Sequence, residues 1–505
     1  MGAMDPFELL AIAARLHPRR ASVLCGDLRL TYPELEHVSR RIGAALLAAG
    51  ARPGDRVGAF FPNCHLYLAA YFAALGEGLI LVPINTRLHP REVGTILEHA
   101  AVRFALGRPD LLPEACGPVH DSGEGWVVSP VRRGSGDAGA PSPPGGAAQL
   151  YYTSGTTGRP KGVVLTRGNV AAHVDMTLEE LRFGAADAWL HAAPMFHLAD
   201  AWAVFTATAA GATHVMIPRF EPEEALRAMT LHGVTLTNLV PAMIPGLLDA
   251  AEARPDPPTR LRLLLSGGAP IAPRLVSRIE SVLRCDYAQT YGLTETAPFL
   301  TFSLLSEPQR RDLPAATQQR LRARTGRPAS GVTLRVVAPP SAEAFQDVPA
   351  DDLAVGEVVA RGATITPGYW RDPQATAEAF RGGWFHTGDL GTIDSHGFLN
   401  LVDRAKDAIV TGGETVYCIE VENALLDHPA VSFAAVYGVP DDRWGEAVRA
   451  AVVLARGAEA DAAALIAFCR DRIAAYKCPR AVDVVADLPR TGSGKIDKRA
   501  LRAPH

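Results

Sequence analysis

Two kinds of hydrophobic pattern alternate along roughly the first 130 residues: helical periodicity and short continuous apolar runs. Apolar side chains recur at helical spacing after residue 34, at Leu35, Val38, Ile42, Leu46 and Leu47. Thr31 and Glu34 are placed as a helix-starting capping box, and a proline lies between them. Residues 56–61 and 79–83 are short apolar runs, which is typical of strands buried on both faces. Helices alternating with buried strands predict an α/β fold of layered sheets.

The length of 505 residues predicts at least two domains, because a single hydrophobic core rarely grows so large. Residues 1–6 resemble an expression-vector remnant and are left out of the fold. Residues 129–149 are rich in Gly, Ala, Pro and Ser, which predicts a flexible linker. We expect a large N-terminal domain over residues 7–405 and a small α+β domain over residues 406–505.

The remaining strands and helices are predicted from shorter segments of the chain. Strands are expected near residues 150–152, 214–217, 261–265, 333–337 and 450–454. Amphipathic helices are expected at residues 420–426 and 462–473, with the last of those strands between them.

Composition and charge exclude some classes of function. A formal net charge of -4 argues against a nucleic-acid partner. No apolar run is long enough to span a membrane. The seven cysteines are scattered singly, so neither a disulfide framework nor a zinc site is indicated, and the cytoplasm is the expected compartment.

The strongest chemical signal is a loop rich in Gly, Ser and Thr that ends in Arg-Pro-Lys-Gly. Its glycines permit backbone N–H groups to turn toward a phosphate, its hydroxyls add donors, and its lysine adds a positive charge. Gly162 follows the lysine where a P-loop has Ser or Thr, so this is a different kind of phosphate loop. The expected ligands of a triphosphate are Thr153, Ser154, Gly155, Thr156, Thr157, Gly158 and Lys161.

Five further motifs follow in order along the chain. They are Tyr291-Gly292-Leu293-Thr294-Glu295, Gly368-Tyr369-Trp370, Trp384-Phe385-His386-Thr387-Gly388-Asp389, Asp403-Arg404-Ala405-Lys406-Asp407 and Gly492-Ser493-Gly494-Lys495. With the glycine-rich loop, they resemble the adenylate-forming superfamily, which includes acyl- and aryl-CoA synthetases, adenylation domains of peptide synthetases, and luciferases. The resemblance covers nearly the whole chain.

The resemblance implies a role for each motif in binding ATP. Tyr291 would stack on adenine, Thr294 would contact the α-phosphate, and Glu295 would bind Mg²⁺. Asp389 and Arg404 would hold the ribose, and Gly268 and Ala269 also belong to the nucleotide site.

The resemblance further implies two reactions and two orientations of the C-terminal domain. Lys495 would stabilise the charge that develops when a carboxylate attacks the α-phosphorus of ATP. The domain would then turn about a hinge at Lys406, and Gly412 and Gly413 would line a tunnel for the arm of coenzyme A.

The acid would bind behind Pro194-Met195-Phe196-His197, where His197 is implied as a catalytic gate beside the carboxylate. His197 stands where amino-acid adenylation domains have Asp, which favours an acid without an α-amino group. Two interpretations of Asp200 and Trp202 remain open: recognition of a polar substituent, or helix capping and core packing. The expected pocket walls are His197, Ala199, Trp202, Asn238, Val240, Gly267, Gly268, Ala269, Thr296 and Phe299.

The leading hypothesis is an acid–thiol ligase that makes acyl-CoA from ATP, CoA and a fatty or aromatic acid, with Mg²⁺ as cofactor. An enzyme that loads a carrier protein is the first alternative, and a catalytically inactive nucleotide-binding regulator is the second. Neither the acid nor the choice between monomer and homodimer follows from the sequence.

Overall fold

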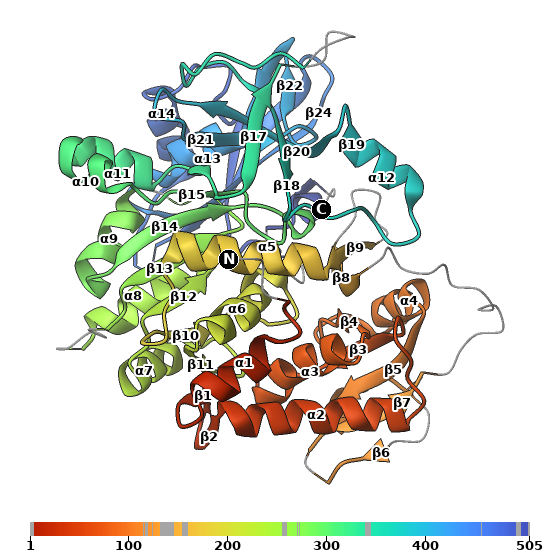
Figure 1. The fold of residues 1–505 in the computed structure, drawn as a ribbon. Helices are drawn as coiled ribbons and strands as arrows, with labels where there is room; N and C mark the ends of the chain where they lie inside the picture. Colours follow the sequence, from red (N-terminus) through yellow and green to blue (C-terminus); the bar gives the residue numbers. More distant parts are fainter. Residues whose placement is uncertain are drawn as a thin grey trace.

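The computed structural model describes residues 5–114, 116, 120–123, 125–131, 146–153, 160–254, 260–269, 271, 273–338, 345–455, 457–490 and 496–502. These residues form an α/β structure with two large sheets, a smaller third sheet, and a fourth sheet built from the C-terminal part of the chain (Figure 1). The predicted fold class is therefore confirmed.

The first large sheet has seven strands. Its central strands β5, β3, β4 and β8 are parallel, and antiparallel strands complete both edges. In spatial order it contains β6 (His120–Asp121), β7 (Val127–Pro130), β5 (Val102–Gly107), β3 (Arg56–Phe60), β4 (Ile80–Pro83), β8 (Ala147–Thr153) and β9 (Lys161–Thr166).

The second large sheet has nine strands, and its parallel centre carries much of the candidate site. Strands β14, β13, β12, β10, β11 and β1 run parallel to one another. In spatial order the sheet contains β16 (Arg327–Pro328), β15 (Thr301–Phe302), β14 (Asp286–Tyr291), β13 (Leu263–Gly267), β12 (Leu236–Leu239), β10 (Ala188–His191), β11 (Thr213–Met216), β1 (Ala21–Cys25) and β2 (Leu28–Thr31).

The third and fourth sheets follow in the chain. The third contains β17 (Val332–Val337), β18 (Gly356–Gly362), β20 (Trp384–Ile393), β19 (Phe380–Arg381) and β21 (Leu399–Arg404). The fourth contains β23 (Glu414–Val416), β22 (Ile409–Thr411), β25 (Gly445–Leu454), β24 (Val431–Asp441) and β26 (Ala481–Val484). The fourth sheet has its own apolar cluster, built around Val436, Val448 and Leu425.

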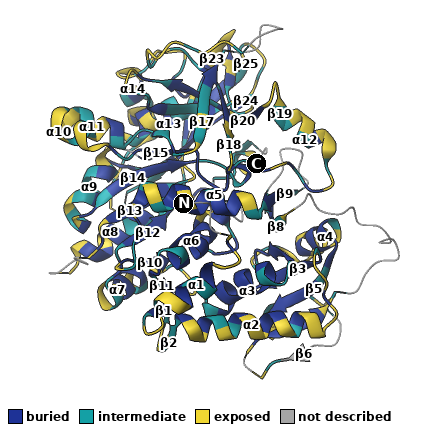
Figure 2. Ribbon diagram, in the orientation of Figure 1, coloured by how far each residue is buried: buried dark blue, intermediate teal, exposed yellow. Residues whose placement is uncertain are grey.

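Helices cover the sheets, and some of them are buried on every side. In helix α3 (His65–Gly76), residues 66–75 are all buried, which explains why this helix shows no polar stripe (Figure 2). The helices are α1 (Leu9–Leu16), α2 (Tyr32–Ala48), α3 (His65–Gly76), α4 (Pro90–Ala100), α5 (Arg167–Leu181), α6 (Leu198–Ala209), α7 (Pro222–His232), α8 (Ile244–Glu252), α9 (Pro273–Leu283), α10 (Glu307–Asp312), α11 (Ala315–Arg322), α12 (Pro373–Ala379), α13 (Cys418–Leu426), α14 (Ala462–Arg470) and α15 (Lys498–Arg502). Short 3₁₀ helices are η1 (Pro109–Leu111), η2 (Pro241–Met243) and η3 (Thr294–Thr296).

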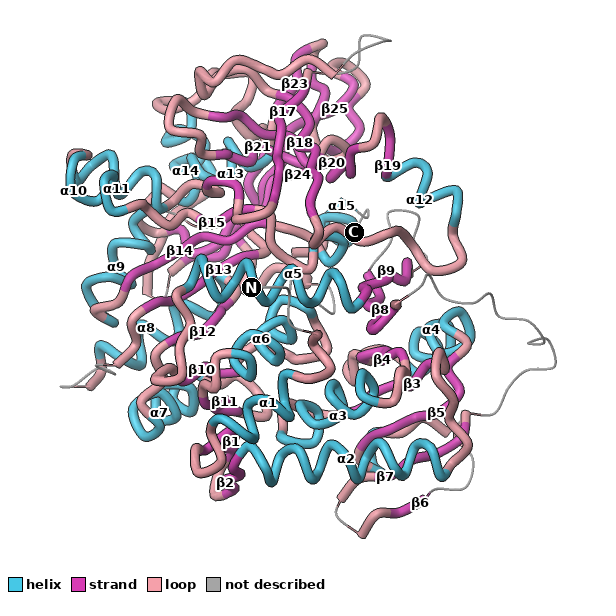
Figure 3. Tube along the Cα trace, viewed as in Figure 1, coloured by secondary structure: helices cyan, strands magenta, loops and turns pink. Residues whose placement is uncertain are grey.

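Most of the elements expected from the sequence lie where the pattern placed them (Figure 3). Helix α2 begins at the predicted capping box of Thr31 and Glu34. Leu47 differs from the expected apolar face, because 42% of it is exposed. Helix α14 ends at Arg470, before the expected residue 473, because a turn follows.

The structure describes only the two ends of the predicted linker at residues 129–149. Strand β7 reaches Pro130 and β8 begins at Ala147, so both ends of the predicted segment 129–149 pair with neighbouring strands. Residues 132–145 lie outside the described residues.

Among the helices that the structure describes, none is long and apolar enough to cross a membrane.

Candidate active site

Four of the predicted site residues lie at or directly after the carboxyl ends of β12, β13 and β14, where ligands commonly bind to parallel sheets. Val240 follows β12, Gly268 and Ala269 follow β13, and Tyr291 ends β14. Gly268 has a φ of +85°, a conformation that favours glycine. A Cβ at Gly292 would lie 1.8 Å from the carbonyl oxygen of Pro298, so the chain turns too tightly there for a side chain.

The first polar cluster joins the nine-stranded sheet to the third sheet. The Tyr291 hydroxyl donates a hydrogen bond to Asp389 Oδ2 at 2.7 Å. Asp389 and Arg404 are opposite each other on β20 and β21, and Arg404 Nε lies 3.1 Å from Asp389 Oδ1. Burial, followed by the charge of Asp389, raises the pKa of Tyr291 well above its usual value, so its hydroxyl stays protonated. The structure therefore brings together the three residues predicted to hold a nucleoside.

The second polar cluster connects Lys161, Tyr369 and Glu295. Strand β9 hydrogen-bonds to the Gly368-Tyr369-Trp370 segment, since Trp370 N–H donates to Gly162 O at 2.7 Å. This pairing places Tyr369 between two predicted ligands of ATP. The Tyr369 hydroxyl donates to Glu295 Oε1 at 2.9 Å, and Lys161 Nζ lies 4.9 Å from the centre of the Tyr369 ring. Tyr369 thus separates a cation from a carboxylate while contacting both.

The residues around Glu295 fit a magnesium ion that binds mainly through ATP. Glu295 is 8% exposed, and its backbone carbonyl is fixed by a hydrogen bond from Thr366 N–H at 2.8 Å. The hydroxyl-bearing Thr294 lies next to it on η3. No group of three or more His, Cys, Asp or Glu residues forms a metal cage within the described part of the chain. One carboxylate with phosphate oxygens is a common environment for Mg²⁺.

Part of the predicted phosphate loop and the predicted catalytic lysine lie outside the described residues. These are Ser154, Gly155, Thr156, Thr157, Gly158 and Lys495. The two ends of the loop are described: Thr153 ends β8, Lys161 begins β9, and the two residues are partners in an antiparallel ladder. The adjoining strands therefore hold the ends of the loop together.

The predicted hinge and tunnel residues lie on the surface at the start of the C-terminal sheet. Lys406 is exposed in the turn between β21 and β22. Burial of part of its side chain, followed by the charge of Arg404, lowers its pKa. Gly412 and Gly413 form the exposed turn between β22 and β23, with φ angles of +61° and +84°. A Cβ at Gly412 would lie 3.0 Å from the Trp444 ring.

Several predicted walls of the acid pocket are in contact, and they come from distant parts of the chain. Asn238 Nδ2 donates to the backbone oxygen of Ala199 at 2.8 Å. The rings of Trp202 and Phe299 pack edge to face, 5.2 Å between centres. His197 is half-buried at the start of α6, with its ring 4.7 Å from that of Phe196. Gly267 packs against Thr290, and Thr296 is fully buried.

The structure decides between the two interpretations of Asp200. Its carboxylate is fully buried, and Oδ2 lies 2.6 Å from Nδ1 of His191. The other carboxylate oxygen accepts a hydrogen bond from the indole N–H of Trp189 at 3.4 Å. Asp200 is therefore a core residue that holds α6 against β10. Trp202 packs in the same core but also lines a small buried cavity.

Two residues of this region received no role from the sequence. Tyr369 belongs to the Gly368-Tyr369-Trp370 motif, so the sequence marked its position but did not indicate its contacts with Glu295 and Lys161. His173 gave no signal, because a single histidine within a mixed helical segment is usually a core residue. It lies in α5 beside Trp202 and Phe299.

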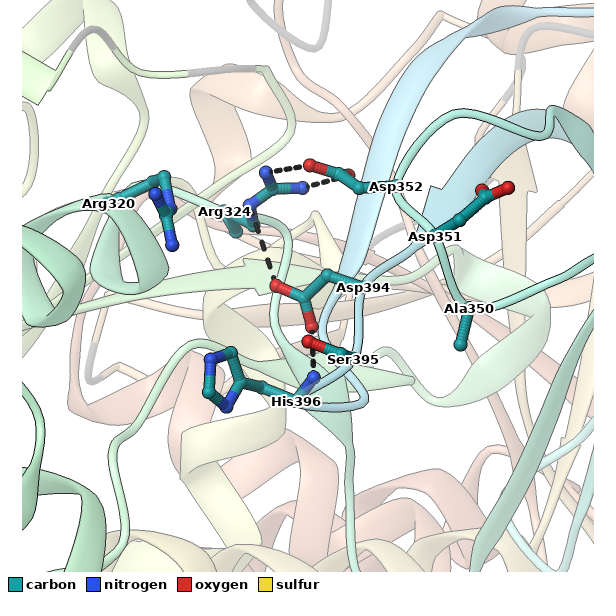
Figure 4. Close-up of a pocket in the computed structure, with 8 residues that line it drawn as sticks. All are labelled: Arg320, Arg324, Ala350, Asp351, Asp352, Asp394, Ser395 and His396. Atoms are coloured by element: carbon teal, nitrogen blue, oxygen red, sulfur yellow. Dashed lines mark hydrogen bonds and ion pairs between the residues drawn. The ribbon is translucent and has the colours of Figure 1, made fainter.

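A more open pocket lies elsewhere, between α11 and the third sheet (Figure 4). Arg324 forms an ion pair with Asp352 and approaches Asp394, at 3.8 Å from Nε. Its lining contains none of the predicted site residues. The arginines of residues 320–324 therefore include ion pairs that support the structure, as a charged helix end commonly does.

Comparison with known proteins supports the same chemistry. The model of the AMP-binding enzyme family matches residues 10–370, and that of the AMP-binding enzyme C-terminal domain matches residues 420–495. A feruloyl-CoA synthase of Amycolatopsis sp is 38% identical, over 97% of this chain and 96% of the relative. A fatty acid–[acyl-carrier-protein] ligase, ScoC of Streptomyces coeruleorubidus, is 35% identical over 97% and 94%.

Solved structures resemble the whole chain. The o-succinylbenzoate CoA synthetase MenE of Bacillus subtilis, in complex with its acyl-adenylate intermediate, has a TM-score of 0.81 and 29% identity. The match covers 99% of this chain and 98% of that enzyme. The same enzyme has also been solved with ATP and a magnesium ion. With both family models matching in order, this chain belongs to the family of AMP-binding enzymes.

Proposed function

We propose that this protein is an ATP-dependent carboxylic acid–CoA ligase, acting on a fatty or aromatic acid in two steps. In the first step the carboxylate attacks the α-phosphorus of ATP, giving acyl-AMP and pyrophosphate. In the second step the thiol of CoA attacks the acyl carbon, giving acyl-CoA and releasing AMP. The observation that carries the proposal is that the segment from Tyr291 to Glu295 connects both polar clusters. Tyr291 hydrogen-bonds Asp389, which pairs with Arg404, and Glu295 hydrogen-bonds Tyr369, whose ring lies beside Lys161.

Each cluster has a specific task in this scheme. Asp389, buried and charged, accepts hydrogen bonds from the ribose hydroxyls, while Arg404 and Tyr291 keep its carboxylate oriented. Lys161 attracts the terminal phosphates, and Tyr369 keeps it from collapsing onto Glu295. Bound through Glu295, Mg²⁺ would offset the charge of the phosphate oxygens. Lys495 is proposed to stabilise the charge that develops at the α-phosphorus.

The acceptor is proposed from the relatives. The feruloyl-CoA synthase and the o-succinylbenzoate CoA synthetase are named for CoA, whereas the ScoC relative is named for a carrier protein. A carrier-protein ligase is therefore the second candidate. The proposed compartment is the cytoplasm, which agrees with seven unpaired cysteines in the described residues.

The acceptor is tested by supplying CoA or a phosphopantetheine-bearing carrier protein to the enzyme with ATP, Mg²⁺ and a panel of acids. We expect acyl-CoA and AMP to accumulate with CoA. Exchange of pyrophosphate into ATP without any acyl-CoA, together with acylation of the carrier, would establish the second candidate instead.

Two lysine variants test the two-step mechanism in opposite directions. Lys495→Ala should slow adenylation at least about 100-fold and spare thioester formation from preformed acyl-AMP, because only the first step needs that cation. Lys406→Pro should spare adenylation and block thioester formation, because proline restricts the backbone rotation on which the second orientation depends. Single-turnover assays of each step provide the measurement. Equal losses in both steps for either variant would refute its role.

A further inference from the structure

A buried histidine beside the acid pocket has no role in the proposed chemistry. His173 lies in α5 and is 3% exposed. Neither Nδ1 nor Nε2 has a hydrogen-bond partner among the residues that the structure describes. A buried polar group without a partner is rare in proteins, because its lost hydration is not replaced. The ring therefore calls for a partner from outside the protein.

The surroundings of His173 connect it to the acid pocket. Its ring lies 5.5 Å from that of Trp202, edge to face, and 6.0 Å from that of Phe299. Trp202 and Phe299 are both predicted walls of the pocket and are in contact with each other. A small cavity opens among His173, Leu198, Trp202 and Ala297. The cavity shares Trp202 with the predicted acid site, and two of its other lining residues, Leu198 and Ala297, directly follow predicted wall residues in the chain.

The large rings limit what can reach this point. Trp202 and Phe299 are 1% and 4% exposed, and Trp189 and Phe302 pack against them from behind. These four rings line the region with aromatic faces and edges, against which a flat ring packs well. The aromatic walls thus favour a planar acid.

The chemistry of the imidazole defines the far end of such an acid. Burial lowers the pKa of His173 to about 3. The backbone of Trp202 and of Ala297 offsets only part of this shift, because neither comes within hydrogen-bonding geometry of the ring nitrogens. The ring is then uncharged at neutral pH, with one nitrogen donating and the other accepting. A phenolic hydroxyl can both donate and accept, so it satisfies either tautomer. An alkyl end or an unsubstituted ring would leave the imidazole without a partner.

We propose that the acid pocket ends at His173, and that its imidazole hydrogen-bonds the ring hydroxyl of an aromatic carboxylic acid. This inference rests on the proposed ligase function and names its substrate class. His173 is then a residue that determines specificity by contact with the substrate. One well-placed hydrogen bond in a buried site should favour the hydroxylated acid over its unsubstituted analogue about 10- to 100-fold.

The test compares three acids with the intact protein: 4-hydroxycinnamate, cinnamate and decanoate, each with ATP, Mg²⁺ and CoA. The readout is kcat/KM for pyrophosphate release. We expect the wild type to prefer 4-hydroxycinnamate over cinnamate about 10- to 100-fold, with decanoate the poorest. In His173→Phe the preference should collapse to within about 3-fold, through loss of activity on the hydroxylated acid alone.

Controls separate this role from a structural one. His37→Phe makes the same substitution on the exposed surface of α2 and should leave the preference unchanged. His173→Gln keeps a donor and an acceptor and should retain part of the preference. If His173→Phe does not fold, the comparison of the three acids in the wild type and in His173→Gln still tests whether His173 sets the preference for the hydroxylated acid.

The outcomes distinguish this inference from the proposed function. Equal activity on both cinnamates, or the best activity on decanoate, overturns the role of His173 while leaving the ligase function standing. A preference that survives in His173→Phe also overturns it. Absence of pyrophosphate release with these three acids and with every acid of the wider panel refutes the ligase function itself.

Discussion

Two buried histidines that hydrogen-bond each other, His191 and His214, differ from a third, His173, in how their ring nitrogens are paired. His191 in β10 binds Asp200 through Nδ1 at 2.6 Å and His214 through Nε2 at 2.9 Å. His214 continues the chain to the hydroxyl of Thr208 at 3.0 Å. His173 in α5 is equally buried, yet neither of its nitrogens has a hydrogen-bond partner among the described residues.

The difference shows that burial alone does not separate structural from functional histidines. The His191 chain links β10, β11 and both ends of α6, so every polar atom that burial removed from water is paired within the fold. His173 instead lines a small cavity together with Trp202, a predicted wall of the acid pocket. A fully paired polar chain supports the fold, whereas an unpaired nitrogen in a cavity wall is available to a ligand.

The strongest way to sharpen this comparison is to break the paired chain. Asp200→Ala should lower the free energy of unfolding by about 3–5 kcal/mol, because it leaves His191 and Trp189 without their buried partner. His173→Phe should change it by no more than about 1 kcal/mol, because no hydrogen bond within the protein is lost. Denaturant unfolding followed by fluorescence measures both. Similar losses in the two variants would contradict the distinction.

The cluster of Tyr291, Asp389 and Arg404 is a third case. Its polar groups are paired with one another and are also predicted to bind ATP. Asp389→Ala should raise the KM for ATP about 100-fold, since it removes charge-assisted hydrogen bonds to the ribose as well as the partner of Tyr291 and Arg404. Glu357→Gln, at a carboxylate on β18 of the same sheet that contacts His386, serves as the matched control and should leave KM unchanged. Steady-state kinetics with varied ATP decide, and an unaltered KM in Asp389→Ala would remove this residue from the ribose site.

The smallest expected effect is on stability in mild acid. His173 has its pKa lowered to about 3 by burial among uncharged rings, so below about pH 6.5 the unfolded chain binds a proton that the folded chain does not. Stability should therefore fall as pH drops from about 6.5 toward 3. Between about pH 8 and about pH 5.5 the wild type should lose about 1.4 kcal/mol more than His173→Phe. Unfolding curves at the two pH values test this, and parallel losses would show that His173 does not titrate this way.

The regular elements follow from the local pattern. The capping box at Thr31, the apolar runs of β3 and β4, and the helices of the C-terminal part all appear close to their predicted positions. Capping and hydrophobic periodicity act within a few residues, so the sequence displays them directly. The residues predicted to bind the nucleotide could likewise be proposed from the sequence, because each stands in a short motif with its own chemistry. Their pairing across sheets could not, because residues 291 and 389 meet only through tertiary contacts.

The sequence by itself determined the α/β fold class and the family of adenylate-forming enzymes, and it predicted a glycine-rich loop for the phosphates of ATP. Only the tertiary structure decided that Asp200 belongs to the core, that Tyr369 lies between Lys161 and Glu295, and that His173 packs against two predicted walls of the acid pocket. The physical reason is that a motif records which groups are present, whereas the partner of each buried polar group is chosen by the packing of sheets and helices that lie far apart in the chain.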